Sequence, residues 1–162
     1  MKVKIDISKT YNDWNVQKNI TKKYISSILK TVLSIHKNFN SIKSVELSIL
    51  LTNDIEMAQL NLLHRKKEGS TNILSFPDTD DILYKKNILK EDLYIGDLAL
   101  SYNKIIIESE EKGISFYNHF THLIIHGILH LLGYDHEKES EAREMESLEV
   151  DLLKTFDIPT PY

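Results

Sequence analysis

The chain has 162 residues, a length that suits one domain with its own hydrophobic core and no need of disulfide bonds. It contains no cysteine, so disulfides and thiolate metal sites are excluded, and any metal ion must be held by His, Asp or Glu. The net charge of −4 is unevenly spread: residues 137–151 carry −5, which leaves the rest of the chain at +1. Residues 1–37 hold eight lysines against two aspartates, which permits a local basic surface without establishing one.

The chain shows no sign of export or membrane insertion. Its first residues, "MKVKIDISKTYNDW", lack the continuous apolar run of a signal peptide. No segment approaches the roughly 20 apolar residues that a helix needs to span a bilayer. We therefore expect a soluble cytoplasmic protein that does not contact a membrane.

The first half of the chain is predicted to form two strands and two helices. Residues 1–8 alternate between apolar and polar and predict a strand. Apolar residues at helical intervals predict a helix from residue 13 to about 35, and the apolar run at 44–51 predicts a second strand. Another helix is expected over "TNDIEMAQLNLLHR" (52–65), whose first three residues are candidate N-caps.

The second half is predicted to add two strands and three helices. A third strand is expected at 71–77, and a polar connection leads to a fourth at 93–101. Gly96 lies inside that strand and indicates a bulge or the close approach of another backbone. Helices are expected at about 102–112, 115–132 and 138–155.

Strands and helices intermix along the chain, which is typical of an α/β or α+β fold. We expect one domain over residues 1–162, with a mixed sheet of roughly four strands and about five helices. The acidic last helix is expected to present a solvated face, with Met145 and Leu148 turned inward.

The helix expected at 115–132 carries a line of histidines. At about 100° per residue, His119, His122, His126 and His130 fall within an arc of roughly 80°, and apolar residues cover most of the remaining surface. A helix that is apolar nearly all round is buried. We therefore expect these histidines to face a cleft.

Three histidines of "HGILHLLGYDH" have the spacing of metal ligands. His126 and His130 lie one helical turn apart, and Gly133 allows a left-handed turn that brings His136 back toward them. Two core histidines at this spacing can arise by chance, but the third after a glycine turn favours a metal. Three protein ligands leave one coordination position open, as in catalytic sites. Three imidazoles suit Zn²⁺, although Ni²⁺ and Cu²⁺ also bind such a set.

The same spacing, His-x3-His-x2-Gly-x2-His, occurs in the metzincin proteases. Those enzymes carry a glutamate directly after the first histidine as general base, and this chain has Gly127 there. The metal ligands of a protease are therefore present without its base. Peptide hydrolysis by the usual route is not expected.

Beyond these local patterns, "HLIIHGILHLLGYDH" resembles the signature of the YbeY-type endoribonucleases, bacterial factors of rRNA maturation. Three further blocks resemble that family in its order and spacing: "LNLLHRKKEGSTNILSFP" (60–77), "IGDLALS" (95–101) and "EAREMESLE" (141–149). Two departures stand out. His64 replaces a frequent Tyr, and residues 67–69 replace a more basic loop, which could weaken RNA contacts without touching the histidines.

The resemblance implies a zincin-like core and one zinc ion per chain held by His126, His130 and His136. It implies cleavage of single-stranded RNA in 16S (small-subunit) rRNA maturation and ribosome quality control. The implied partners are RNA, the small ribosomal subunit and assembly factors, and no DNA. Arg65 matches the functional arginine of the family. A guanidinium can grip a phosphate through two hydrogen bonds and offset charge as it develops, whereas from the residues alone Arg65 reads as a solvated surface arginine.

Two other functions stay open: a zincin-fold hydrolase of a non-RNA substrate such as a peptide, and a non-catalytic ribosome-assembly factor with a structural zinc. Also open are the general base and the nucleophile, either water at the metal or the RNA 2′-hydroxyl. Asp135 is expected to orient a ligand imidazole or to cap the next helix. His122 is expected to support the site or pack beside it, and His119 and His36 to lie at the surface. The sequence does not indicate a role for Asp97.

Overall fold

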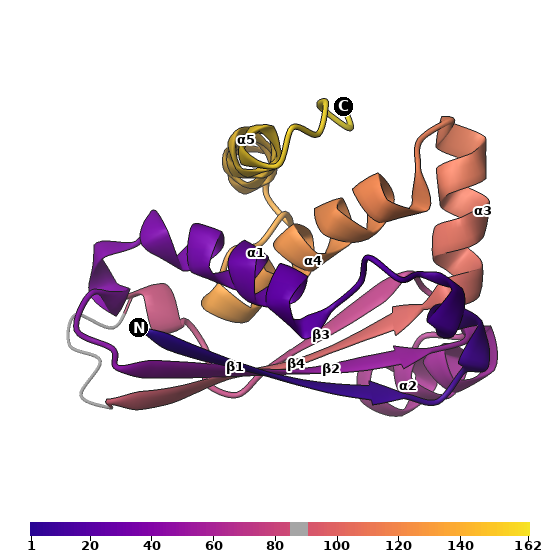
Figure 1. The fold of residues 1–162 in the computed structure, drawn as a ribbon, viewed down its shortest axis with the longest axis horizontal. Helices are drawn as coiled ribbons and strands as arrows, with labels where there is room; N and C mark the ends of the chain where they lie inside the picture. Colours follow the sequence, from indigo (N-terminus) through magenta and orange to yellow (C-terminus); the bar gives the residue numbers. More distant parts are fainter. Residues whose placement is uncertain (85–90) are drawn as a thin grey trace.

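The computed structural model describes residues 1–84 and 91–162, and its frame is one four-stranded sheet (Figure 1). The strand order is β1-β2-β4-β3, in which β1, β2 and β4 run parallel and β3 runs antiparallel to β4. The predicted mixed sheet of four strands is therefore confirmed. The strands are β1 (Lys2–Lys9), β2 (Ser44–Thr52), β3 (Ile73–Pro77) and β4 (Asp92–Ser101).

Helices cover both faces of this sheet. In Figure 1, α1 and α4 lie on one face, α2 lies on the other, and α5 lies beyond α4, away from the sheet. The α/β class and the last three predicted helices are confirmed to within one residue at each end. The α-helices among the described residues are α1 (Lys22–Ser34), α2 (Asp54–Arg65), α3 (Tyr102–Lys112), α4 (Phe116–Leu132) and α5 (Glu139–Thr155).

The helix predicted from residue 13 is wrong in its first part. Residues Asn12–Val16 form a separate 3₁₀ turn, and α1 begins only at Lys22, after Thr21 accepts a 3.1 Å hydrogen bond from the Tyr24 amide. Trp14 explains the difference. Its side chain is 1% exposed, and its indole donates to the Thr52 carbonyl at 2.9 Å. Local periodicity assigned Trp14 to the helix. Its position is instead fixed by this contact with β2, 38 positions away in the sequence.

Two other expectations concern the connections. Of the three candidate caps of α2, Asn53 is the N-cap, because its side chain accepts from the Glu56 amide at 3.0 Å. Residues 85–90 of the predicted polar connection lie outside the described part of the chain. Among the described helices, none is both long and apolar enough to cross a membrane.

Gly96 marks a close backbone approach, as its place in the strand predicted. The register between β2 and β4 shifts at this point, and Gly96 has φ +134°, a conformation that L side chains rarely adopt. A Cβ atom at Gly96 would lie 2.3 Å from the Phe76 carbonyl oxygen. No side chain fits there without moving β3, the strand that borders the histidines' cleft.

Gly96→Ala is therefore expected to lower the free energy of unfolding by about 2–4 kcal/mol, through backbone strain and the clash with β3. Urea denaturation of the variant and the wild type measures the difference. Gly113→Ala is the comparison, because Gly113 also has a positive φ (+65°) but nothing lies within 4 Å of an added Cβ. Equal destabilisation in the two variants would contradict the clash.

Candidate metal centre

Helix α4 carries the first two histidines and is held rigidly against the sheet. Ser115 caps its N-terminus by accepting from the Asn118 amide at 3.0 Å. Its apolar residues are almost fully buried, which confirms the expectation of a buried helix: Phe120, Ile124, Ile125, Ile128 and Leu129 are each 0% exposed. Side chains on a helix packed this way hold fixed positions.

The predicted left-handed turn at Gly133 is also confirmed. Gly133 has φ +109° and ends α4, and its amide donates to the His130 carbonyl at 3.0 Å. The Tyr134 amide then donates to the Leu129 carbonyl at 3.0 Å. This pair of hydrogen bonds is a Schellman-type ending, which reverses the chain. The reversal returns His136 to the histidines of α4.

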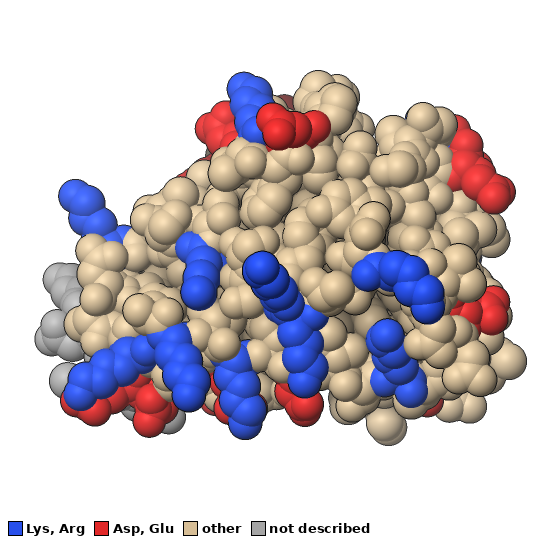
Figure 2. Space-filling view, in the orientation of Figure 1, with Lys and Arg blue, Asp and Glu red and all other residues tan. Residues whose placement is uncertain are grey.

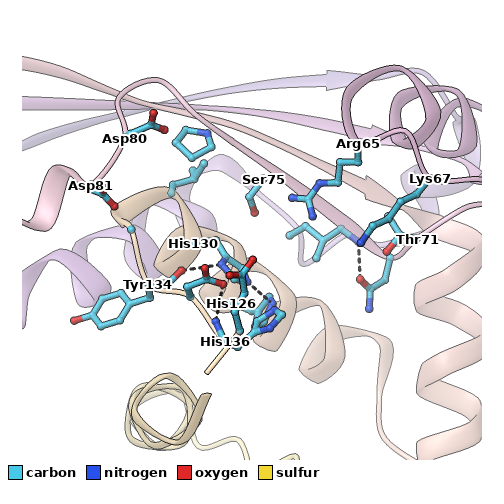
Figure 3. Close-up of a pocket in the computed structure, with 17 residues that line it drawn as sticks. Arg65, Lys67, Thr71, Ser75, Asp80, Asp81, His126, His130, Tyr134 and His136 are labelled. Carbon is cyan, nitrogen blue, oxygen red and sulfur yellow. Dashed lines mark hydrogen bonds between the residues drawn. The ribbon is translucent and has the colours of Figure 1, made fainter. Parts of the chain in front are cut away.

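The structure brings three imidazoles to one point. One ring nitrogen from each of His126, His130 and His136 lies within 4.8 Å of the others. The rings face a shared space (Figure 3), and the Nε2 atoms of His126 and His130 are 3.1 Å apart. No other such group of His, Asp or Glu side chains occurs in residues 1–84 and 91–162. These three histidines can therefore hold a metal ion.

The remaining nitrogens of two of these rings are already used. The Nδ1 atom of His126 lies 2.5 Å from Glu149 Oε1, and the Nδ1 atom of His130 lies 2.9 Å from the Tyr134 carbonyl oxygen. Both partners are acceptors, so each Nδ1 atom carries the proton and donates. The Nε2 lone pairs of the two rings then face each other at 3.1 Å, and a cation shared between them would relieve their repulsion. The donor set fits a zinc ion.

The electrostatics of His130 agree with a ligand role. Burial lowers the pKa of His130 to about 4, with a further contribution from the neighbouring His126. A group with this pKa is neutral at pH 7. Metal binding requires the neutral imidazole, so no proton has to leave His130 before a cation binds.

Glu149 of α5 is a buried carboxylate directly behind His126. It is 0% exposed and accepts from His126, from His122 Nε2 at 3.1 Å and from the Tyr162 hydroxyl. Burial works to raise the pKa of Glu149, but the hydrogen bonds from these three side chains outweigh it and lower the pKa to about 2. Glu149 thus places a negative charge beside His126, on the Nδ1 side of the ring.

The histidines lie at one side of an open cleft of about 650 Å³, and Arg65 and Lys67 lie at another (Figure 3). Arg65 is the last residue of α2, and Lys66 after it is left-handed with φ 55°, which ends the helix and turns the chain. Within the described residues Arg65 makes no ion pair, so its guanidinium is available to an anionic ligand. Asp80 and Asp81 line a different part of the cleft.

Comparison with known proteins assigns the family. The family model described as Endoribonuclease YbeY matches residues 9–157. The chain belongs to this family. A curated Endoribonuclease YbeY of Bartonella bacilliformis is 47% identical over 117 residues, which are 72% of each chain. The solution structure of TM1509 from Thermotoga maritima has a TM-score of 0.56, covering 94% of this chain and 91% of that one, and at 20% identity it supports the fold alone.

YbeY endoribonucleases function in rRNA maturation, so neither the peptide hydrolase nor the non-catalytic assembly factor is favoured. The position of Gly127 gives a physical reason against the peptide hydrolase. A Cβ atom there would lie 2.7 Å from Ile73 Cδ1 and 2.8 Å from Leu98 Cδ2, side chains of the sheet. The Gly127 carbonyl oxygen lies 3.3 Å from the Ser75 hydroxyl. Gly127, the position at which a metzincin carries its glutamate, therefore faces the sheet.

The expectation for the acidic last helix is wrong at one residue. Met145 is buried and Leu148 partly buried, as predicted, but Glu149 is also fully buried. The spacing contained a signal for this. Glu149 follows Met145 by four positions and precedes Leu152 by three, so it lies on the buried stripe of α5. A glutamate on such a stripe indicates a buried partner.

The other histidines correct or refine the sequence-based expectations. His119 is not at the surface: it is 1% exposed, and its Nε2 atom lies 3.2 Å from Glu108 Oε1. Burial lowers the pKa of His119. His36 is half-buried and lies 2.8 Å from the Tyr134 hydroxyl through its Nε2 atom. His122 lies beside the metal centre: its Nε2 atom is 3.1 Å from Glu149 Oε2, and its ring lies edge-on to that of His126 with centroids 6.4 Å apart.

The structure also shows where Asp135 and Asp97 lie. Asp135 accepts a 2.7 Å hydrogen bond from the backbone amide of His136, and the N-cap of α5 is Lys138. Asp135 therefore stabilises the loop that carries His136, and it does not cap α5. Asp97 lines a separate hollow, together with Asp6 and His64, and is not among the residues of the histidine cleft.

Proposed function

We propose that this protein is a zinc-dependent endoribonuclease that cleaves single-stranded RNA during maturation of the small-subunit rRNA. The observation that carries the proposal is one cleft lined by three converging imidazoles and by an arginine without an ion pair among the described residues. Membership of the YbeY family supports RNA as the substrate. The proposal includes one zinc ion per chain, a cytoplasmic location, and the small ribosomal subunit with its assembly factors as partners.

In this proposal His126, His130 and His136 hold the zinc ion. When bound, the ion supplies Lewis acidity and a positive charge against the negative charge that builds on phosphorus. Arg65 grips two oxygens of the scissile phosphate through its planar guanidinium. Because this grip strengthens as the phosphorus gains charge, Arg65 stabilises the transition state more than the substrate.

The shape and charge of the molecule suit a single strand. A cleft of about 650 Å³ admits a nucleotide unit, whereas a duplex keeps its bases paired and its backbone on a rigid helix. Lys67 lies beside Arg65 in the cleft. Figure 2 shows further basic side chains spread over β1 and α1, where the exposed lysines of residues 1–37 lie, at the edge of the sheet opposite β3 and the cleft. Such surfaces attract the phosphate backbone without reading its sequence.

A substrate comparison tests the proposal. Zinc-loaded protein is incubated with a single-stranded RNA, with the same RNA annealed to its complement, and with casein. We expect fragments from the single strand, much less cleavage of the duplex and no cleavage of casein. Intact single-stranded RNA would contradict the nuclease function, and casein fragments would support the peptide hydrolase instead.

A further inference from the structure

Glu149 is the centre of a hydrogen-bond network that joins α4, α5 and the segment after α5. Its Oε1 atom faces His126 Nδ1 at 2.5 Å. Its Oε2 atom faces His122 Nε2 at 3.1 Å and accepts from the Tyr162 hydroxyl. Both oxygens are thus engaged, Oε1 by α4 and Oε2 by α4 and the C-terminal segment, and these contacts favour one orientation of the carboxylate. Its hydrogen bond to His126 therefore has a preferred direction.

The charge of Glu149 needs a compensating cation. A fully buried carboxylate is costly unless an opposite charge pairs with it. Among the described residues no Lys or Arg lies within ion-pair distance of Glu149, and its close partners are two histidines and a tyrosine. The Nδ1 atom of His122 is buried without a hydrogen-bond partner, which favours a neutral ring that donates from Nε2. A divalent ion on the far nitrogen of His126 would supply the missing positive charge.

The same contact fixes His126 for its role. A proton on Nδ1, held by Glu149, places the free lone pair on Nε2, and the carboxylate holds the ring in one orientation. That Nε2 atom is the one 3.1 Å from His130 Nε2. A carboxylate in this position also makes the imidazole a stronger ligand.

We propose that Glu149 is a positioning residue of the metal centre, which orients His126 and balances the charge of the bound cation. His122 and Tyr162 hold the carboxylate in place, and the Tyr162 ring lies edge-on to His122 with centroids 5.7 Å apart. This inference rests on the proposed zinc site. It adds a residue of α5 and a tyrosine 13 positions beyond it to a site otherwise built from α4 and its following loop.

Zinc affinity, measured by competition with a chromophoric chelator, tests this role without any activity assay. Glu149→Gln keeps the size of the side chain but removes the charge and leaves one acceptor oxygen for three donors. We expect its zinc affinity to fall by about 10–100-fold. Tyr162→Phe removes one donor from the carboxylate, and a fall of about five-fold is expected. Glu144→Gln, an exposed position of the same helix, should match the wild type.

A purely structural role for Glu149 would give a different result. In that case Glu149→Gln would change the thermal unfolding of the metal-free protein and leave the zinc affinity of the folded fraction unchanged, which overturns the proposal. Where Glu149→Gln does not fold, Tyr162→Phe decides, and wild-type affinity in that variant overturns it. If the wild type binds no zinc, the proposed three-histidine site fails as well. If the wild type binds and Glu149→Gln binds equally, this inference alone fails.

Discussion

His130→Ala is expected to lose stoichiometric zinc and, with it, RNA cleavage. The substitution removes one of three converging nitrogens, and the two that remain cannot enclose the ion. Loss of a ligand should cost more than the roughly 10–100-fold fall in affinity that loss of an outer hydrogen-bond partner causes. Metal content after dialysis, measured by atomic absorption, gives the direct readout.

Thermal unfolding provides a second readout of the same variant. A ligand that binds only the folded state stabilises it by about 2.7 kcal/mol at a concentration 100 times its Kd. Added zinc should therefore raise the Tm of the wild type and leave that of His130→Ala unchanged. His64→Ala is the control, because His64 is exposed and lines the hollow that contains Asp97. Full zinc content in His130→Ala would show that the three-histidine site is wrong.

Arg65→Ala is expected to lower kcat/KM for single-stranded RNA by about 10²–10³-fold, the usual effect of removing one donor that stabilises transition-state charge. Zinc content and Tm should stay at wild-type values, because Arg65 is exposed and is not a member of the three-histidine group. Cleavage rates on one RNA, with metal content measured on the same samples, separate the two effects.

Arg65→Lys refines the test. Lysine keeps the positive charge but lacks the planar fork, so activity should recover only in part. Arg143→Ala is the matched control, since Arg143 lies on α5 in an exposed ion pair with Glu139 at 3.8 Å, an interaction of little value to stability. Wild-type cleavage by Arg65→Ala would contradict a catalytic role for Arg65. A loss of zinc in that variant would place Arg65 among the residues that build the metal centre.

Local patterns in the sequence were sufficient to predict how the histidine segment folds. His126 and His130 lie one turn apart, which is a property of any helix, and the Gly133 turn follows from the one residue type that adopts a positive φ without strain. Gly127 also showed in the sequence that the protease base is missing. Only the structure showed that this position of α4 faces Ile73 and Leu98, whose side chains would have to shift to admit a larger residue. The bounds expected for the last three helices also agree with the structure to within one residue.

Tertiary structure decided the features that depend on contacts between distant segments. Trp14 leaves the helical pattern because its indole reaches Thr52, and His119 is buried because α3 supplies Glu108. The placement of Arg65 at the histidine cleft requires α2, β3 and α4 to meet. Periodicity describes which face of a helix is buried and does not say what that face meets. For this reason the sequence by itself determined the three candidate ligands, and only the fold revealed the carboxylate of Glu149 behind them.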